Sequence, residues 1–221
     1  IEEFLLRTAG PEVYSQWIDH RIPFDSPQVI KAFEEFGRLV KNDKLVDGGA
    51  KKAIATSESD AALGIFNSPP DCYLHRQGNT ISSVFPESKT PRIDYDVLPL
   101  PSIDTKLGSP LLVSGEVMVM FNQTPESESL MQYLATPVPH ETWAALGGFL
   151  SPHKGVAPEA YPDLVTQDGA QILADADGVR CDASDLMPGY VGTDIFWSGI
   201  MEFAGGKPAA EVAKEIDQSW P

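Results

Sequence analysis

The stretch MPGYVGTDIFWSGIMEFAGG, residues 187–206, joins a turn signal to a helical pattern and places two large aromatic residues side by side. Its proline-glycine pair favours a turn, and Thr193 or Asp194 is suited to cap the start of a helix. A helix that begins there carries Trp197 in its first turn, with Phe196 about 100° round the helix axis. We therefore expect Phe196 to turn into a core. Trp197 then either faces a cleft or fills a core itself.

The composition is that of a globular protein with a large acidic excess. The chain has 221 residues, of which 42% are hydrophobic and 22% charged, and this is enough to bury a sizeable core. Sixteen basic residues against 32 acidic ones give a formal net charge of −16. Because such a chain is repelled by phosphate backbones and anionic membranes, nucleic acid is an unfavourable partner. Solubility alone is a sufficient reason for the acidity.

The sequence contains neither a membrane span nor a targeting segment. No run of about 18 apolar residues occurs, so no insertion into a membrane is expected from this segment. The first residues, IEEFLLRTAGPEVYSQW, lack a methionine, a basic region and a small-residue cleavage site, and do not form a signal peptide. We expect the chain to be a mature, trimmed or partial form of its protein.

Helical and extended patterns alternate without an internal repeat, which predicts the α/β class. A core-facing helix is expected to start at Ser26-Pro27, because apolar residues then recur on one face. The residues of that face are Val29, Ile30, Phe33, Phe36, Leu39 and Val40. Further helices are expected in PESESLMQYLATP, HETWAAL, TQDGAQILADADG and PAAEVAKEIDQSW. Strands are expected at residues 72–74 and in the apolar run at residues 111–121.

The usual catalytic and nucleotide-binding motifs are missing, since GxSxG, HExxH, Walker and GxGxxG patterns do not occur. The acidic run at residues 175–185 resembles a calcium loop only superficially, because Val179 and Arg180 stand at a ligand and a glycine position. Asp182 with Asp185 could do the acid-base work of a glycoside hydrolase, and this remains an alternative function. The histidines at 20, 75, 140 and 153 are scattered and read as surface or capping residues. No catalytic residue, metal site or cofactor is predicted.

Two cysteines, Cys72 and Cys181, are too few and too far apart for a zinc cluster. By themselves they are compatible with one disulfide or with two buried thiols.

Planar polar side chains gather in HRQGN, residues 75–79, directly after the expected strand. Arg76, Gln77 and Asn79 each offer two or more hydrogen-bonding groups in a fixed plane, which suits sugar hydroxyls. Trp197 would supply a flat apolar surface for the C–H face of a pyranose ring. A solvated turn is the alternative interpretation of HRQGN.

Several long blocks, in a fixed order, resemble the extracytoplasmic solute-binding proteins of carbohydrate ABC importers, especially the α-glucoside branch. The blocks are RTAGPEVYSQWIDHRIPFDSPQVIKAFEEFG, PPDCYLHRQGNTISSVFPE, DYDVLPLP, GGFLSPHK followed by YPD, and LMPGYVGTDIFWSGIMEFAGGKPAAEVAKEIDQSWP. They cover nearly the whole chain, so the resemblance is far more specific than any short motif.

The resemblance implies a two-lobed periplasmic-binding-protein-like fold with α/β lobes, in which closure around a sugar is signalled to permease subunits. Residues 1–221 would then form a single α/β domain, the C-terminal lobe, with most of the N-terminal lobe missing. That lobe would comprise roughly residues 1–95 and 150–221, and residues 105–147 would return to the first lobe. The resemblance also implies a non-enzymatic protein located in the periplasm or held as a cell-surface lipoprotein.

Carried onto single positions, the resemblance implies that Trp197 stacks on the sugar and that Met187 lies in the loop leading to it. At the place of HRQGN, maltose-binding relatives have a Gly-Pro-Trp signature with a second stacking aromatic residue. This chain lacks an aromatic residue there, which implies polar recognition by Arg76, Gln77 and Asn79.

Two further implications concern other parts of the chain. Gly148 and Phe149 match a hinge-side segment, and they complete the predicted sugar contacts. Cys72 and Cys181 would share one lobe outside the cell, where an oxidised pair persists, and this favours a disulfide. An interaction module without a small-molecule site is the remaining alternative.

Overall fold

The computed structural model describes all residues from Ile1 to Pro221, and they form two compact units. Unit 1 consists of residues 1–61, 101–114 and 177–221, and unit 2 of residues 62–100 and 115–176. The expectation that the chain forms a single lobe of the longer protein stays a prediction. The return of residues 105–147 to a first lobe stays a prediction about the longer protein.

Helices make up most of the regular structure. The α-helices are α1 (Glu2–Ile18), α2 (Pro27–Val40), α3 (Gly49–Ala55), α4 (Glu58–Leu63), α5 (Pro125–Leu134), α6 (Pro137–Ala144), α7 (Leu164–Ala174), α8 (Ala183–Leu186), α9 (Trp197–Ala204) and α10 (Ala209–Gln218). A π-helical segment, Val191–Phe196, leads into α9. Short 3-10 helices lie at Gly64–Phe66, Asn79–Val84, Thr105–Leu107 and Pro158–Ala160. None of the helices combines the length and the apolar character needed to cross a membrane.

The sheet is small. Strand β1 (Leu111–Val113) pairs in parallel with β2 (Val179–Cys181), with Leu111 opposite Val179. The protein thus contains both element types, as predicted, but it is α-rich with a single two-stranded sheet.

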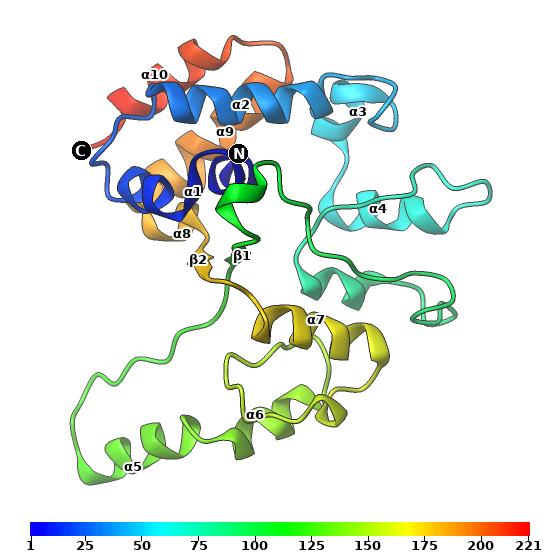
Figure 1. Cartoon of the computed structure of the whole chain (residues 1–221), viewed down its shortest axis with the longest axis vertical. Coiled ribbons are helices and arrows are strands. Elements are labelled where there is room, and N and C mark those ends of the chain that lie inside the picture. The colour runs from blue at the N-terminus through cyan, green and yellow to red at the C-terminus, as the bar shows by residue number, and fades with distance from the viewer. The chain divides into compact units, whose positions relative to one another are not determined.

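The core of unit 1 joins helices from both ends of the chain, as Figure 1 shows for α1 and α2 with α9 and α10. Trp17 on α1 is fully buried at its centre. Its ring centroid lies 5.6 Å from that of Tyr14, 5.1 Å from that of Phe24 and 5.6 Å from that of Phe196. Large aromatic side chains in such tilted and edge-to-face contacts dominate the energetics of a core. Unit 1 is therefore stabilised by contacts between the N-terminal and the C-terminal segments of the chain.

Helix α2 confirms the predicted core-facing helix. It starts directly after Ser26, and Pro27 occupies its first turn. Val29 and Phe33 are fully buried, whereas Leu39 is 44% exposed. The buried stripe is thus narrower than the apolar pattern suggests.

Most of the strand predictions are wrong. Of the apolar run at residues 111–121, only β1 is a strand, and the side chains from Val117 to Phe121 are 38–97% exposed. Residues 72–74 are irregular as well. A strand needs a hydrogen-bonded neighbour, and the only neighbour that β1 has in this chain is β2. An apolar composition alone is not sufficient to form a strand.

Unit 2 has a small aromatic core of its own. Phe66, Phe85 and Tyr95 pack edge to face, with ring centroids 4.9–6.0 Å apart. Asp163 caps the start of helix α7, because its carboxylate accepts two backbone N–H groups of the first turn at 2.9 and 3.0 Å. This cap explains why the predicted helix in TQDGAQILADADG forms, slightly earlier than expected.

Candidate functional site

The helix that carries the two aromatic residues starts earlier than the sequence predicts. The N–H groups of Val191 and Gly192 both donate to the carbonyl of Pro188, at 2.7 and 3.1 Å. The hydroxyl of Thr193 donates to the carbonyl of Gly189 at 2.6 Å, one turn back along the same helix. Both residues predicted as caps therefore lie inside the π-helical segment. The predicted cap at Thr193 or Asp194 is wrong, because helical structure begins directly after the proline.

A close backbone approach accounts for the glycine in the π-helical segment. A Cβ atom at Gly192 would lie 2.0 Å from the carbonyl oxygen of Ser184 in α8. Only a residue without a side chain allows this approach. Single π-helical turns within longer helices are frequent at functional sites.

Phe196 and Trp197 have opposite environments. Phe196 is 2% exposed and packs edge to face against Trp17 and Phe24, which confirms that it turns into the core. Trp197 is 61% exposed. Trp197 is therefore not part of the core of unit 1. Tyr190, at the start of the same helical stretch, is 52% exposed as well.

Met187 does not have the environment of a ligand contact. It is 5% exposed and belongs to the hydrophobic core cluster of unit 1. Its side chain therefore anchors the turn that precedes the π-helical segment, and its part in the loop leading to Trp197 stays a prediction.

The polar loop lies in unit 2. Arg76, Gln77 and Asn79 are all exposed. The side-chain oxygen of Gln77 accepts the N–H of Gly78 at 2.8 Å, and Asn79 begins a 3-10 helix. The three side chains are thus sequence neighbours on one loop of unit 2, whereas Trp197 and Met187 belong to unit 1.

The double glycine after α6 forms a tight turn in unit 2. Gly147 and Gly148 have φ angles of 80° and 70°, a region that glycine adopts at little cost. The turn brings the ring of Phe149 flat against Trp143, with centroids 4.3 Å apart and planes 9° apart. Sequence reasoning missed Trp143, because a tryptophan inside a helical pattern reads as a packing residue. Its position one turn before a double glycine is the signal that could have singled it out.

The disulfide between Cys72 and Cys181 stays a prediction. Cys72 is half-buried in unit 2, and Cys181 is exposed on β2 of unit 1. The expectation that both cysteines share one lobe of the longer protein also stays a prediction.

The carboxylates proposed for the alternative hydrolase have structural partners. Asp182 caps α8 by accepting the N–H of Ser184 at 3.0 Å, and Glu2 accepts the same N–H at 3.1 Å. Asp185 accepts the hydroxyl of Ser114 at 3.2 Å. Burial, and then the adjacent charge of Asp182, raise the pKa of Glu2 to about 7. Glu2 and Asp182 are therefore part of the contact between α1 and α8.

We expect Glu2→Gln to stabilise the protein above pH 7. Because the pKa of Glu2 rises from 4.5 to about 7 on folding, the folded state binds more protons, and stability falls as the pH rises through that window. The expected gain in the free energy of unfolding is at most about 3 kcal/mol at pH 8 and almost none at pH 4.5. Urea unfolding at both pH values measures it, with Glu12→Gln, on the exposed side of the same helix, as the control. An effect of Glu2→Gln that does not depend on pH would contradict the assignment.

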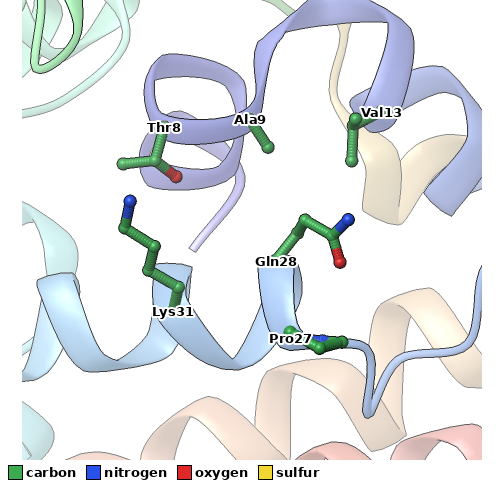
Figure 2. A pocket seen from close by; sticks show the side chains of 6 residues that line it. All are labelled: Thr8, Ala9, Val13, Pro27, Gln28 and Lys31. Atoms are coloured by element: carbon green, nitrogen blue, oxygen red, sulfur yellow. The ribbon is translucent and has the colours of Figure 1, made fainter.

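Unit 1 also has an open pocket of about 380 Å³ between α1 and α2. It is lined by Thr8, Ala9, Val13, Pro27, Gln28 and Lys31. Figure 2 shows Gln28 and Lys31 reaching from α2 toward the residues of α1. The pocket offers an amine, an amide and a hydroxyl but no aromatic surface. None of the predicted sugar contacts lines it.

The proteins that the chain resembles over its whole length are binding proteins. The chain is 45% identical over 221 residues to the osmoprotective compounds-binding protein GgtB of Synechocystis sp., a match that covers 100% of this chain and 52% of the relative. It is 40% identical over 222 residues to the alpha-glucosides-binding periplasmic protein AglE of Rhizobium meliloti, covering 100% of this chain and 48% of the relative. These matches confirm the resemblance to solute-binding proteins.

The chain spans about half the length of these curated relatives. No protein-family model matches the chain. No solved structure matches it either.

Proposed function

We propose that this chain is part of a non-catalytic, extracytoplasmic protein that binds a carbohydrate, an α-glucoside or another oligosaccharide, and delivers it to the permease of an ABC importer. The observation that carries the proposal is the match of the entire chain to two binding proteins. One of them is named for α-glucosides and for the periplasm, and the other for osmoprotective compounds.

We further propose that the chain forms the C-terminal lobe of the longer protein. The exposed apolar run Val117–Phe121 supports this proposal. An uninterrupted apolar run is typical of a strand that is covered on both faces of a sheet. In the longer protein this run would pair with strands of the other half, which is the expected return of residues 105–147 to the first lobe.

The sugar contacts would come from two kinds of side chain. Trp197 is exposed at the start of α9, and Phe196, the residue before it, is buried in the core. The flat surface of the indole is thus held in place for the apolar face of a pyranose. Arg76, Gln77 and Asn79 would supply hydrogen bonds to the hydroxyls. Each kind of side chain by itself suits a sugar, the indole for its apolar face and the planar polar groups for its hydroxyls.

The two alternatives have less support. A glycoside hydrolase would need Asp182 and Asp185 to act on a substrate, yet both carboxylates accept hydrogen bonds from nearby backbone or hydroxyl groups. Neither relative is named as an enzyme. Both relatives are named for the compounds that they bind, which does not favour an interaction module without a ligand site.

Calorimetry on the full-length protein tests the proposal, with maltose, sucrose and trehalose as probes. We expect micromolar or tighter binding of at least one sugar, and no release of nitrophenol from a nitrophenyl α-glucoside. Residues 1–221 alone should bind far more weakly. A sugar held between two lobes loses about half its contacts when one lobe is absent, at roughly 1 kcal/mol per hydrogen bond.

The outcomes separate the proposals. Turnover of the aryl glucoside would favour the hydrolase. Micromolar binding by residues 1–221 alone would contradict the assignment to one lobe. If the full-length protein binds none of the three sugars, the proposed binding of carbohydrates of this class is wrong.

A further inference from the structure

Helix α6 presents an indole that is both exposed and fixed in orientation. Trp143 is 42% exposed, and Phe149 lies flat against it at 4.3 Å between centroids. Phe149 covers one face of the indole, so the exposed surface of Trp143 lies on the opposite face and along the ring edges. A pair that served only to close the loop would not need to keep so much of the larger ring in solvent.

Hydrogen bonds beneath the pair hold its orientation. The ring of Phe149 lies 5.9 Å from that of His140, measured between centroids. The Nε2 atom of His140 donates to the carbonyl of Leu134 at 2.9 Å, so that Nδ1 accepts the hydroxyl of Ser151 at 2.9 Å. Ser151 is 8% exposed, and its N–H donates to the hydroxyl of Tyr161 at 3.1 Å. A contact that is ordered before binding loses less conformational entropy when a ligand arrives.

The backbone beside the stacked pair is open. No heavy atom lies within 4 Å of the position that a Cβ atom of Gly148 would take. The N–H groups of Gly148 and Phe149 make no hydrogen bond to another backbone group. Two backbone donors therefore lie next in sequence to one another beside the stacked pair, and the Cβ side of Gly148 is open.

We infer that Trp143 is an aromatic contact for the carbohydrate in unit 2, with the N–H groups of Gly148 and Phe149 as donors to its hydroxyls. A pyranose ring has an apolar C–H face and a rim of hydroxyls, and this surface offers a partner to both. The inference rests on the proposed carbohydrate-binding function. It gives unit 2 the aromatic contact that the loop HRQGN lacks.

Variants of the full-length protein test the inference, with the tightest-binding of maltose, sucrose and trehalose as the probe. We expect Trp143→Ala to raise the calorimetric Kd at least tenfold, and Trp143→Phe to retain most of the affinity. The matched control is Leu146→Ala, since Leu146 is 82% exposed, follows in the same segment and takes no part in the stack. Its Kd should stay within twofold of the wild type.

A second measurement does not depend on the stability of the alanine variant. The sugar should protect part of the tryptophan fluorescence of the wild type from quenching by acrylamide, and this protection should be smaller in Trp143→Phe. Unchanged affinity in Trp143→Ala, or equal protection in Trp143→Phe, would overturn the role of Trp143 while leaving carbohydrate binding intact. Wild-type protein that binds none of the sugars would instead overturn the proposed function, and the inference with it.

Discussion

Gly192→Ala is expected to destabilise the protein by about 3 kcal/mol or more, the upper end of what overpacking costs. The new methyl group would lie 2.0 Å from the carbonyl oxygen of Ser184 and 2.9 Å from its carbon. These are backbone atoms of α8, which cannot turn aside as the end of a long side chain can. Urea unfolding of the full-length protein measures the loss.

Gly189→Ala is the matched control for this substitution. Gly189 lies three residues earlier in the same helical stretch, and a Cβ atom there would meet no heavy atom within 4 Å. Because alanine favours a helix more than glycine does, the control should be neutral or slightly stabilising. Equal stabilities for the two variants would show that α8 and the π-helical segment do not approach as closely as described.

Phe196→Ala should cost about 3–5 kcal/mol of stability, whereas Trp197→Ala should leave the unliganded protein within about 0.5 kcal/mol of the wild type. The reason is that Phe196 is 2% exposed between Trp17 and Phe24, while its neighbour is 61% exposed. In contrast, Trp197→Ala should weaken sugar binding by about 1–3 kcal/mol, the range known for bases stacked on aromatic residues.

Thermal unfolding without ligand and calorimetry with sugar separate the two roles. If Trp197→Ala unfolds many degrees lower and its folded fraction binds sugar normally, the residue has a packing role. If Phe196→Ala is as stable as the wild type, the core of unit 1 is not as described.

Local signals in the sequence were sufficient for some of the helices, among them α2 and α10. Pro27 after Ser26 predicts the start of α2, and Val212 and Ile216, spaced one turn apart on α10, are both 1% exposed as their pattern requires. These signals act within a few residues, so they can be read without knowledge of the tertiary structure. The start of the helix before Trp197 was misplaced because Pro188 and Thr193 offer competing signals only a few residues apart.

Strands and the arrangement of the site depend on distant residues. The pairing of Leu111 with Val179 joins segments whose local patterns do not indicate one another. The candidate site shows the same limit. The exposure of Arg76 follows from its polar loop, but the burial of Met187 and the stack of Trp143 on Phe149 depend on how separate segments pack.

The order in which the chain builds its two units affects how the protein can evolve. Unit 2 consists of two excursions, residues 62–100 and 115–176, and each begins and ends in unit 1. The second leaves unit 1 just after β1 and returns to it just before β2, and these two strands pair in parallel within unit 1. Insertions, deletions and substitutions within these excursions leave the buried aromatic cluster around Trp17 unchanged. New ligand preferences can therefore arise in unit 2 by changes in loop length and sequence, at little risk to the folding of the segments that enclose it.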